Sequence, residues 1–392
     1  MDKIYLDHAA TTPVKPEVLE AMMPYFTQSF GNPSSIYQVA QINKKAIDEA
    51  REMIAKHLGA NTNEIFFTSG GTEADNWAIK GIVEANKNKG NHIITTKIEH
   101  HAVLHTCEYL EKQGFEVTYL DVNEEGVINL EELKAAIKDT TILISIMYAN
   151  NEVGTIMPIK EIGAIAKERG IAFHTDAVQA IGQVCINVKE QNIDALSLSG
   201  HKIYGPKGIG VLYIRRGLRI TNLIHGGAQE RGRRAGTENV PAIVGLAKAI
   251  ELAYTDFEAK NERIKNLRDR LMNGILETIP YSKLNGSSTN RLANNVNIGF
   301  EFVEGESLLL LLDMNGVAAS SGSACTSGSL DPSHVLLALG LPHEKAHGSL
   351  RLTLGESTTE EDVDYVLEKL PGIVQRMRDM SPLYEEFVKN NQ

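Results

Sequence analysis

The chain has 392 residues, of which 42% are hydrophobic and 23% are charged, the composition of an ordinary globular protein long enough for two domains. Its formal net charge of −11 argues against a nucleic-acid-binding protein, because such proteins carry a basic surface. No run of about 18 apolar residues predicts a membrane span, and the first residues lack the apolar core of a signal peptide. Three cysteines cannot form a disulfide framework, so we expect reduced thiols and a cytoplasmic protein.

Strand-like and helix-like segments alternate through the first half of the chain. The expected strands are residues 64–68, 92–95, 116–120, 142–146 and 171–173, and the expected helices are residues 74–85, 102–112, 130–137 and 159–168. Apolar strands separated by helices predict a largely parallel sheet with helices on both faces. Ligands bind such a sheet at the carboxyl ends of its strands, so residues at those ends are the first candidates for a site.

The second half of the chain predicts a smaller domain joined by a long helix. That helix is expected over residues 240–279, with Asn239 as its N-cap and Pro241 in its first turn. The smaller domain is expected to contain strands at residues 295–300 and 349–353 and helices at residues 305–314 and 359–380. Residues 318–329 are small and polar, which predicts a mobile loop.

Two residues at the ends of predicted strands indicate catalytic chemistry. Lys202 follows the apolar run 195–198, and Asp176 follows the strand at 171–173. A lysine can form a Schiff base with the aldehyde of pyridoxal phosphate, and a carboxylate can keep the pyridine nitrogen protonated so that the ring accepts electrons. If a turn begins at Asp176, Gln179 faces the same way and would reach the phenolic oxygen. A helix cap at Asp176 is an equally good explanation of this pattern.

A glycine-rich turn at residues 68–73 links an expected strand to an expected helix. Glycines such as Gly71 let the backbone approach an anion, the start of the helix offers free N–H groups, and Thr72 adds a hydroxyl. The alternative is an ordinary turn in which Thr72 caps the helix. A basic loop at residues 231–237 could likewise bind a phosphate or a carboxylate, or form a solvated basic surface.

Histidines are concentrated at residues 100–105, after an expected strand. His101 and His105 have the i, i+4 spacing of a metal-binding pair, but the sequence offers no evident third ligand. The preferred interpretation is that one imidazole stacks on a planar ligand and acts as an acid or a base. Capping or surface histidines are the alternative.

The three cysteines have different surroundings. Cys107 lies in an expected helix and Cys185 in a strand-like run, so both are interpreted as structural residues. Cys325 lies in the loop of small residues, without apolar neighbours to bury it. An exposed thiol on a loop can ionise, attack and carry sulfur to another molecule, so Cys325 is a candidate nucleophile.

In their order along the chain, these segments resemble the motifs of cysteine desulfurases of the NifS/IscS type, a branch of the class V aminotransferases among the fold-type I pyridoxal phosphate enzymes. The resemblance covers nearly the whole chain, and its motifs are residues 5–13, 31–35, 68–73, 99–100, 150–154, 176–179, 199–202, 233–239, 321–325 and 349–351. It implies an α/β fold, in which a large domain at residues 14–257 has a mainly parallel seven-stranded sheet flanked by helices. Residues 1–13 and 258–392 would form a smaller α+β domain that carries the Cys325 loop and Arg351.

The resemblance assigns a role to each candidate residue. Lys202 would be the Schiff-base lysine that also moves the substrate Cα proton, His100 the ring-stacking acid–base group, and Cys325 the nucleophile that receives sulfur. The residues implied in cofactor binding are Asp176, Gln179, Gly71, Thr72, Ser199 and His201, together with Thr237 from the other subunit of a homodimer. Asn151 and Arg351 would bind the substrate carboxylate.

The implied reaction converts L-cysteine to L-alanine and leaves the sulfur as a persulfide on Cys325, for a scaffold protein of iron–sulfur assembly or another acceptor protein. A related aminotransferase would keep Lys202 and Asp176 but would not need a cysteine in a loop. A selenocysteine lyase would keep them as well, since selenium leaves with less help from a nucleophile. A non-catalytic partner in iron–sulfur assembly is the remaining alternative, and the intact set of catalytic residues argues against it.

Overall fold

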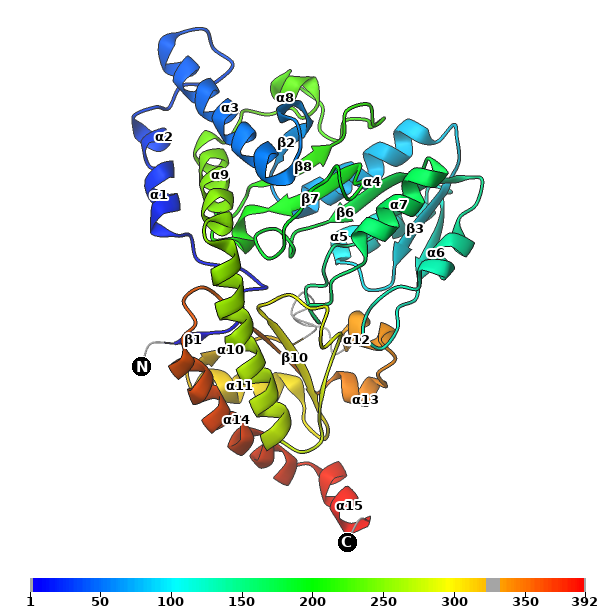
Figure 1. Ribbon diagram of the computed structural model, residues 1–392, viewed down its shortest axis with the longest axis vertical. Coiled ribbons are helices and arrows are strands. Elements are labelled where there is room, and N and C mark those ends of the chain that lie inside the picture. The colour runs from blue at the N-terminus through cyan, green and yellow to red at the C-terminus, as the bar shows by residue number, and fades with distance from the viewer. Residues whose placement is uncertain (1–2, 322–331, 391–392) are drawn as a thin grey trace.

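The computed structural model describes residues 3–321 and 332–390 of the chain. One region is built on a large sheet and a second on a smaller sheet, and helices α9 (Val240–Tyr254) and α10 (Phe257–Thr278) run from the first to the second (Figure 1). Within the described ranges, no helix combines the length and the apolar character that crossing a membrane requires.

Seven strands form the large sheet, in the spatial order β2-β8-β7-β6-β5-β3-β4. Their bounds are β2 (Ile65–Thr68), β3 (His92–Thr96), β4 (Glu116–Leu120), β5 (Thr141–Ser145), β6 (Ala172–Asp176), β7 (Ala195–Ser199) and β8 (Gly210–Ile214). Strand β8 is antiparallel to both of its neighbours, and the pairs from β7 to β4 are parallel. The predicted mainly parallel seven-stranded sheet is confirmed, although the sequence analysis did not identify β8.

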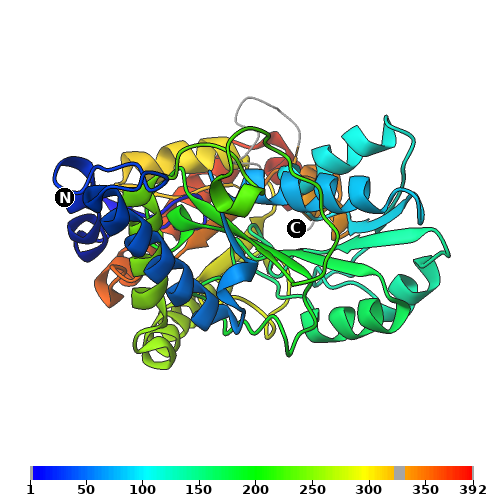
Figure 2. The same cartoon turned by 90° about the horizontal axis from the view of Figure 1, so that it is seen from above.

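Helices cover both faces of this sheet, as the view from above shows (Figure 2). In this region the helices are α1 (Pro16–Met22), α2 (Pro24–Thr27), α3 (Gln38–Leu58), η1 (Thr62–Glu64), α4 (Gly71–Asn86), α5 (His101–Glu111), α6 (Leu130–Ala136), α7 (Ile159–Arg169), η2 (Gly200–Lys202), α8 (Gln229–Gly232) and α9. Ile65 and Phe67 of β2 belong to the apolar cluster that contains α3, α7 and α9, whereas Phe66 between them belongs to the cluster that contains α4 and α5. This alternation follows from the pleat of the strand, and burial on both faces explains the continuous apolar runs.

The single helix expected over residues 240–279 is wrong, because the chain forms two helices there. Between α9 and α10, Asp256 has a φ of 50° and adopts the left-handed conformation. A left-handed residue cannot continue a right-handed helix, so α9 ends before this residue and α10 begins after it. The expected start of α9 is confirmed, since the side chain of Asn239 accepts a hydrogen bond of 3.2 Å from the backbone N–H of Ala242.

The second region is built on a three-stranded antiparallel sheet in the order β12-β10-β9. Its elements are β1 (Ile4–Tyr5), β9 (Ser282–Leu284), β10 (Asn295–Phe300), α11 (Gly305–Met314), β11 (Val317–Ala318), α12 (His334–Ala338), α13 (His343–Ala346), β12 (Ser349–Thr353), α14 (Glu360–Asp379) and α15 (Pro382–Asn390). Side chains of α10, α11, α14, β10 and β12 form an apolar cluster separate from those of the large sheet. The expected helix at residues 359–380 is present as α14, and a further helix, α15, follows it. The domain boundary at residue 257 stays a prediction.

Candidate active site

A cavity of about 250 Å³ lies at the carboxyl ends of β6 and β7. The predicted site residues that line it are Gly71, Thr72, His100, Asn151, Asp176, Gln179, Ser199, His201, Lys202 and Arg351. Thr237 is exposed on the loop after α8 and does not line this cavity. Cys325 lies outside the described residues. The structure therefore brings together side chains that are up to about 280 residues apart in sequence, at the edge of the sheet where a ligand is expected.

Lys202 reaches the cavity from the short helix η2, directly after β7. Its Nζ donates hydrogen bonds of 2.5 and 2.8 Å to the backbone oxygens of Ala9 and Ala10. These carbonyls belong to the chain segment between β1 and α1, so the N-terminal segment forms part of the cavity wall.

Asp176 is the last residue of β6, and its side chain is buried beside the cavity. Its Oδ1 accepts a hydrogen bond of 2.9 Å from the backbone N–H of Val178 in the turn that follows β6. No helix begins there, so the alternative of a helix cap at Asp176 is wrong. Burial raises the pKa of Asp176 to about 6, against an opposing effect of Lys202. A cation placed against this carboxylate would therefore offset the energetic cost of burying its negative charge. Gln179 donates through Nε2 to the oxygen of Ala9 at 3.0 Å.

The N-terminus of α4 faces the same cavity. Gly70 is the N-cap residue, with a φ of 152°, and its lack of a side chain leaves the first amides of the helix without a side-chain cap. Thr72 lies in the first turn, so its predicted alternative role as the N-cap residue is wrong. A Cβ atom at Gly71 would lie 2.7 Å from Cγ2 of Val178, which explains a glycine there. The arrangement offers several N–H groups and a hydroxyl to an anion.

Arg234 of the basic loop is bound close to this helix terminus. Its Nε and Nη2 donate to the carboxylate of Glu73 at 2.9 and 3.0 Å. The residue before this loop, Glu230, is also fixed, because its buried carboxylate accepts two hydrogen bonds of 2.8 Å from Arg51. At least part of the loop is thus fixed against α4 rather than being a solvated basic surface.

His100 is the N-cap residue of α5. Its Nδ1 accepts a hydrogen bond of 3.1 Å from the backbone N–H of Ala102, so the proton of the neutral ring is on Nε2. Burial, together with the charge of Lys202, lowers the pKa of His100 to about 4, and the ring is neutral near pH 7. The ring of His101 lies 5.0 Å from that of His105 and 4.8 Å from that of His334, but in the described ranges no group of three or more such side chains is arranged to hold a metal ion.

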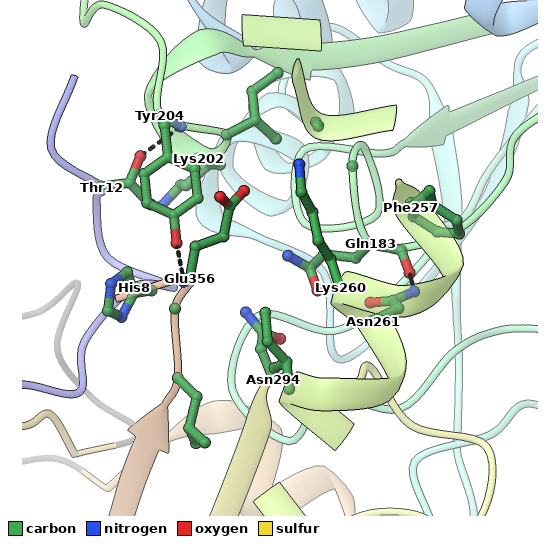
Figure 3. Close-up of a pocket in the computed structure, with 16 residues that line it drawn as sticks. His8, Thr12, Gln183, Lys202, Tyr204, Phe257, Lys260, Asn261, Asn294 and Glu356 are labelled. Atoms are coloured by element: carbon green, nitrogen blue, oxygen red, sulfur yellow. Dashed lines mark hydrogen bonds between the residues drawn. The ribbon is translucent and has the colours of Figure 1, made fainter. Parts of the chain in front are cut away.

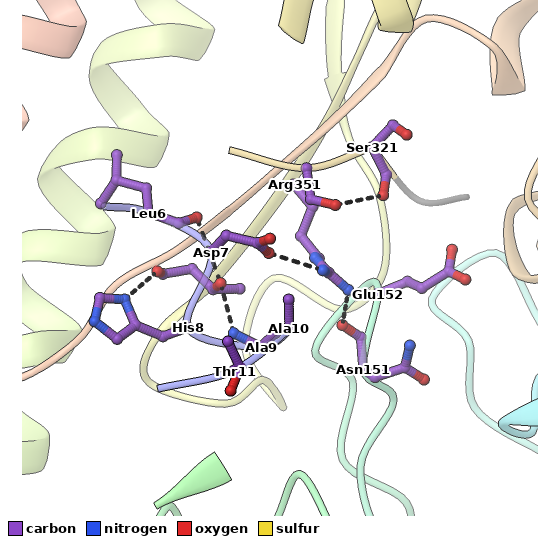
Figure 4. A network of polar contacts seen from close by, with 12 residues as sticks. Leu6, Asp7, His8, Ala9, Ala10, Thr11, Asn151, Glu152, Ser321 and Arg351 are labelled. Carbon is purple, nitrogen blue, oxygen red and sulfur yellow. Dashed lines mark hydrogen bonds and ion pairs between the residues drawn. The ribbon is translucent and has the colours of Figure 1, made fainter. Parts of the chain in front are cut away.

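Arg351 extends from β12 into a polar network at the cavity (Figure 4). Its Nη2 donates to Oδ1 of Asp7 at 2.9 Å, and its Nη1 donates to the backbone oxygen of Asn151 at 3.0 Å. The side chain is 2% exposed, and Nε has no hydrogen-bond partner among the described residues. A buried N–H group without a partner is costly, so this guanidinium is suited to receive an anionic ligand.

A second, smaller cavity lies behind Lys202 (Figure 3). Its volume is about 30 Å³, room for a water molecule rather than for a cofactor. On its wall, the backbone N–H of Glu356 donates to the hydroxyl of Tyr204 at 2.7 Å, and Lys15 forms an ion pair of 2.5 Å with the Glu356 carboxylate. The first contact joins the segment after β12 to the loop that follows Lys202, and the second joins that segment to the residue before α1.

A family model described as aminotransferase class V matches residues 4–366. The chain belongs to the class V aminotransferase family. A curated relative named cysteine desulfurase IscS, from Clostridium botulinum, is 64% identical over 392 residues, which cover 100% of this chain and 99% of the relative. Two solved structures are also similar. A NifS-like protein matches with a TM-score of 0.90 and 39% identity over 95% of this chain and 99% of its own. SspA in complex with cysteine matches with a TM-score of 0.81 and 42% identity over 91% of this chain and 100% of its own.

Membership of the class V family implies the use of pyridoxal phosphate, and the cavity residues fit that group. The uncapped start of α4 suits a phosphate, and the buried carboxylate of Asp176 suits a protonated ring nitrogen. Lys202 suits an aldehyde, because its amine lines the same cavity. The donor types and their common location therefore agree with the cofactor that the family implies.

Two cysteine interpretations have different outcomes in this class V family member. Cys107 is buried in α5, as expected for a structural residue. Cys185 is exposed and lies outside any strand, so its interpretation as a structural residue of a strand-like run is wrong.

The sequence analysis missed two buried acids near the cavity. Asp75 lines the cavity from α4, one turn after Thr72, and Glu99 directly precedes His100. Burial raises the pKa of each carboxyl group, and the charge of Asp176 adds to the effect on both of them. The signal was present for Asp75, because a residue three positions after Thr72 lies on the same side of the helix.

Glu99 gives the protein a measurable pH dependence of stability. It is fully buried, its Oε1 accepts from Thr96 Oγ1 at 2.7 Å and from the Met147 N–H at 3.0 Å, and burial raises its pKa to about 8. Because folding raises this pKa, the contribution to stability is fully present below the unfolded value and is lost as the pH rises through about 8. We expect Glu99→Gln to melt at a higher temperature than the wild type at about pH 7.5, and this difference to be smaller at about pH 5.5. Between the two pH values, the difference in the free energy of unfolding should change by an amount on the order of 2 kcal/mol.

Thermal unfolding of the cofactor-loaded proteins, followed by circular dichroism at both pH values, measures this difference. Glu20→Gln is the matched control, because Glu20 is exposed and its replacement should leave the melting temperature unchanged at both pH values. A difference between Glu99→Gln and the wild type that is the same at both pH values would contradict the prediction.

Proposed function

We propose that this protein is a cysteine desulfurase that converts L-cysteine to L-alanine and retains the sulfur as a persulfide on Cys325. The observation that carries the proposal is the meeting of Lys202, Asp176 and Arg351 at one cavity in a member of the class V family. The name of the 64% identical relative and the cysteine in complex with the similar protein SspA support cysteine as the substrate.

Arg351 and Asn151 would orient the substrate. The Nε–H of Arg351 is buried without a partner among the described residues, and the Asn151 side chain lines the same cavity. A substrate carboxylate at this position would satisfy that N–H group and accept a charge-assisted hydrogen bond. Fixing the carboxylate restricts the rotation of the substrate and aligns its Cα–H bond with the reacting centre.

Lys202 would move the Cα proton. Its Nζ lies at the cavity, beside the backbone oxygens of Ala9 and Ala10. Pyridoxal phosphate, when bound, supplies an electron sink for the carbon from which the proton leaves. Asp176 would stabilise a positive charge on the bound cofactor, and His100 provides a neutral ring that carries its proton on Nε2.

Sulfur transfer would take place at the thiolate of Cys325. The thiolate attacks the substrate sulfur, so an S–S bond forms while the C–S bond breaks. The electron pair of the C–S bond passes to the substrate carbon skeleton, which takes up one proton at Cβ. Lys202 returns the proton that it removed from Cα, and the product leaves as L-alanine. The sulfur remains as a persulfide on the enzyme for a scaffold protein of iron–sulfur assembly or another acceptor protein.

The proposal includes a homodimer. An exposed apolar surface follows α1 and α2 and the segment after them, and its side chains are Leu19, Met23, Phe26, Phe30 and Ile36. Ile36 is 94% exposed, and several large exposed apolar side chains within one chain segment support an interaction site there. A second copy of this chain is the proposed occupant, and Thr237 of that copy would complete the phosphate site.

The test is alanine release from L-cysteine. The purified, cofactor-loaded protein is incubated with L-cysteine and a reductant, without any 2-oxo acid, and alanine and sulfide are measured. A desulfurase forms both products under these conditions. An aminotransferase forms no alanine without a 2-oxo acid, and a non-catalytic partner forms none at all, so absence of alanine would overturn the proposal.

A further inference from the structure

The residues on either side of 322–331 form hydrogen bonds close to the proposed substrate-binding pair, Asn151 and Arg351. On the N-terminal side, Ser320 and Arg351 exchange two backbone hydrogen bonds of 2.7 and 3.2 Å. On the C-terminal side, the hydroxyl of Ser333 donates to Oε2 of Glu152, the residue that follows Asn151. Both partners of this second contact are buried, with exposures of 3% for Ser333 and 5% for Glu152.

His334, the next residue, makes a second contact, with the segment that carries His100. Its Nε2 donates a hydrogen bond of 2.9 Å to the backbone oxygen of Glu99, directly before His100. Ser333 also accepts hydrogen bonds from the N–H groups of Val335 and Leu336, at 3.1 and 3.3 Å, and so begins α12. The start of α12 is thereby fixed to two segments that each carry a predicted site residue.

We propose that Ser333 and Glu152 are positioning residues, whose side-chain hydrogen bond holds the chain that follows residues 322–331 at a fixed place beside the substrate-binding pair Asn151 and Arg351. The inference rests on the proposed function, because the proposed nucleophile, Cys325, belongs to residues 322–331. The sulfur of the substrate and the sulfur of Cys325 must meet within bonding reach, and small misplacements of reacting atoms are costly.

The backbone of Glu152 is held independently of its side chain. Its N–H donates to Oδ1 of Asn150 at 2.9 Å, and its oxygen accepts from Nδ2 of Asn295 and of Asn297, each at 3.1 Å. Removal of the Glu152 carboxylate therefore breaks the link to Ser333 without releasing the backbone that carries Asn151. Variants of the Glu152 side chain therefore test its hydrogen bond to Ser333 and not the position of the backbone around Asn151.

Four variants isolate the link. Glu152→Ala and Ser333→Ala each break it, and Glu152→Gln keeps an oxygen that accepts from the Ser333 hydroxyl. The double variant Glu152→Ala/Ser333→Ala shows whether the two side chains act together. Ser287→Ala is the matched control, because Ser287 is a buried serine whose Oγ accepts a hydrogen bond of 3.1 Å from Asn290 rather than bonding to Glu152 or Ser333.

Two measurements are made on each cofactor-loaded protein. The first is the single-turnover rate of persulfide formation on Cys325 with L-cysteine, measured by alkylation and mass spectrometry. The second is the dissociation constant of L-alanine, which has the amine and the carboxylate but no sulfur, measured from the absorption of the cofactor. We expect Glu152→Ala and Ser333→Ala to lower the rate roughly tenfold and to change the L-alanine dissociation constant less than about twofold.

The double variant should lose no more than either single variant, and Glu152→Gln and Ser287→Ala should keep the wild-type rate. Three results would each overturn the positioning role. The first is a rate loss in the double variant equal to the product of the two single losses, and the second is a loss in Glu152→Gln equal to that in Glu152→Ala. The third is a rate that no variant changes. A wild type that releases no alanine would overturn the proposed function itself, and with it the need for positioning, so the two failures are distinguishable.

Discussion

Replacing Lys202 with alanine is expected to lower the rate of alanine formation at least about 1,000-fold, because the variant loses its proposed base at the substrate Cα. Nζ of Lys202 is held at the cavity by the oxygens of Ala9 and Ala10. A methyl group at this position can neither move a proton nor bond to an aldehyde. The assay is alanine release from L-cysteine with the cofactor supplied in excess.

A second readout separates catalysis from folding. Borohydride reduction should add the mass of the reduced cofactor to a peptide containing Lys202 in the wild type and to no peptide in the variant. Lys207→Ala is the matched control, since Lys207 is exposed five residues further along and should keep both the activity and the labelled peptide. A Lys202→Ala protein with near-wild-type alanine formation would remove this residue from the mechanism.

The residues whose chemistry is tied to a strand end could be predicted from the sequence. Lys202 and Asp176 follow apolar runs, and parallel strands bring their carboxyl ends together at one edge, so the meeting of the two side chains follows from the fold class. Asn239 could be predicted for a similar reason, because N-capping depends on the residue type and on the few residues that follow.

Contacts made by backbone groups or between distant segments could not be predicted. The acceptors for Lys202 are the oxygens of Ala9 and Ala10, and a carbonyl has no signature in a side-chain pattern. The ion pair of Arg351 with Asp7 joins residues 344 positions apart, through the packing of β12 beside the N-terminal segment. Such pairs depend on the tertiary structure and not on local periodicity.

The break between α9 and α10 illustrates a different limit. The apolar periodicity continues across residues 240–279, but Asp256 takes a left-handed conformation that short polar residues tolerate. Helical propensity is a weak constraint compared with the packing of two helices against different clusters. For Thr237 and Cys325, the proposed roles rest on the resemblance to the family.

Replacing Cys325 with alanine is expected to reduce alanine formation from L-cysteine about 100-fold or more, because no thiolate remains to take the sulfur as the C–S bond breaks. The Lys202 amine, the Asp176 carboxylate and the Arg351 guanidinium are unchanged in this variant, so binding of L-alanine and the absorption of the cofactor should stay as in the wild type. The measurement is alanine release together with persulfide detection by alkylation and mass spectrometry.

Cys185→Ala is the matched control for this experiment. Cys185 is an exposed thiol in the described part of the chain and lies away from the cavity lining, so its loss should change neither product. Equal alanine release from the wild type and from Cys325→Ala would exclude Cys325 as the nucleophile. That result would favour a lyase acting on selenocysteine, because selenium leaves carbon with less help from a nucleophile, and comparison of the two substrates on the same variant would then decide between the activities.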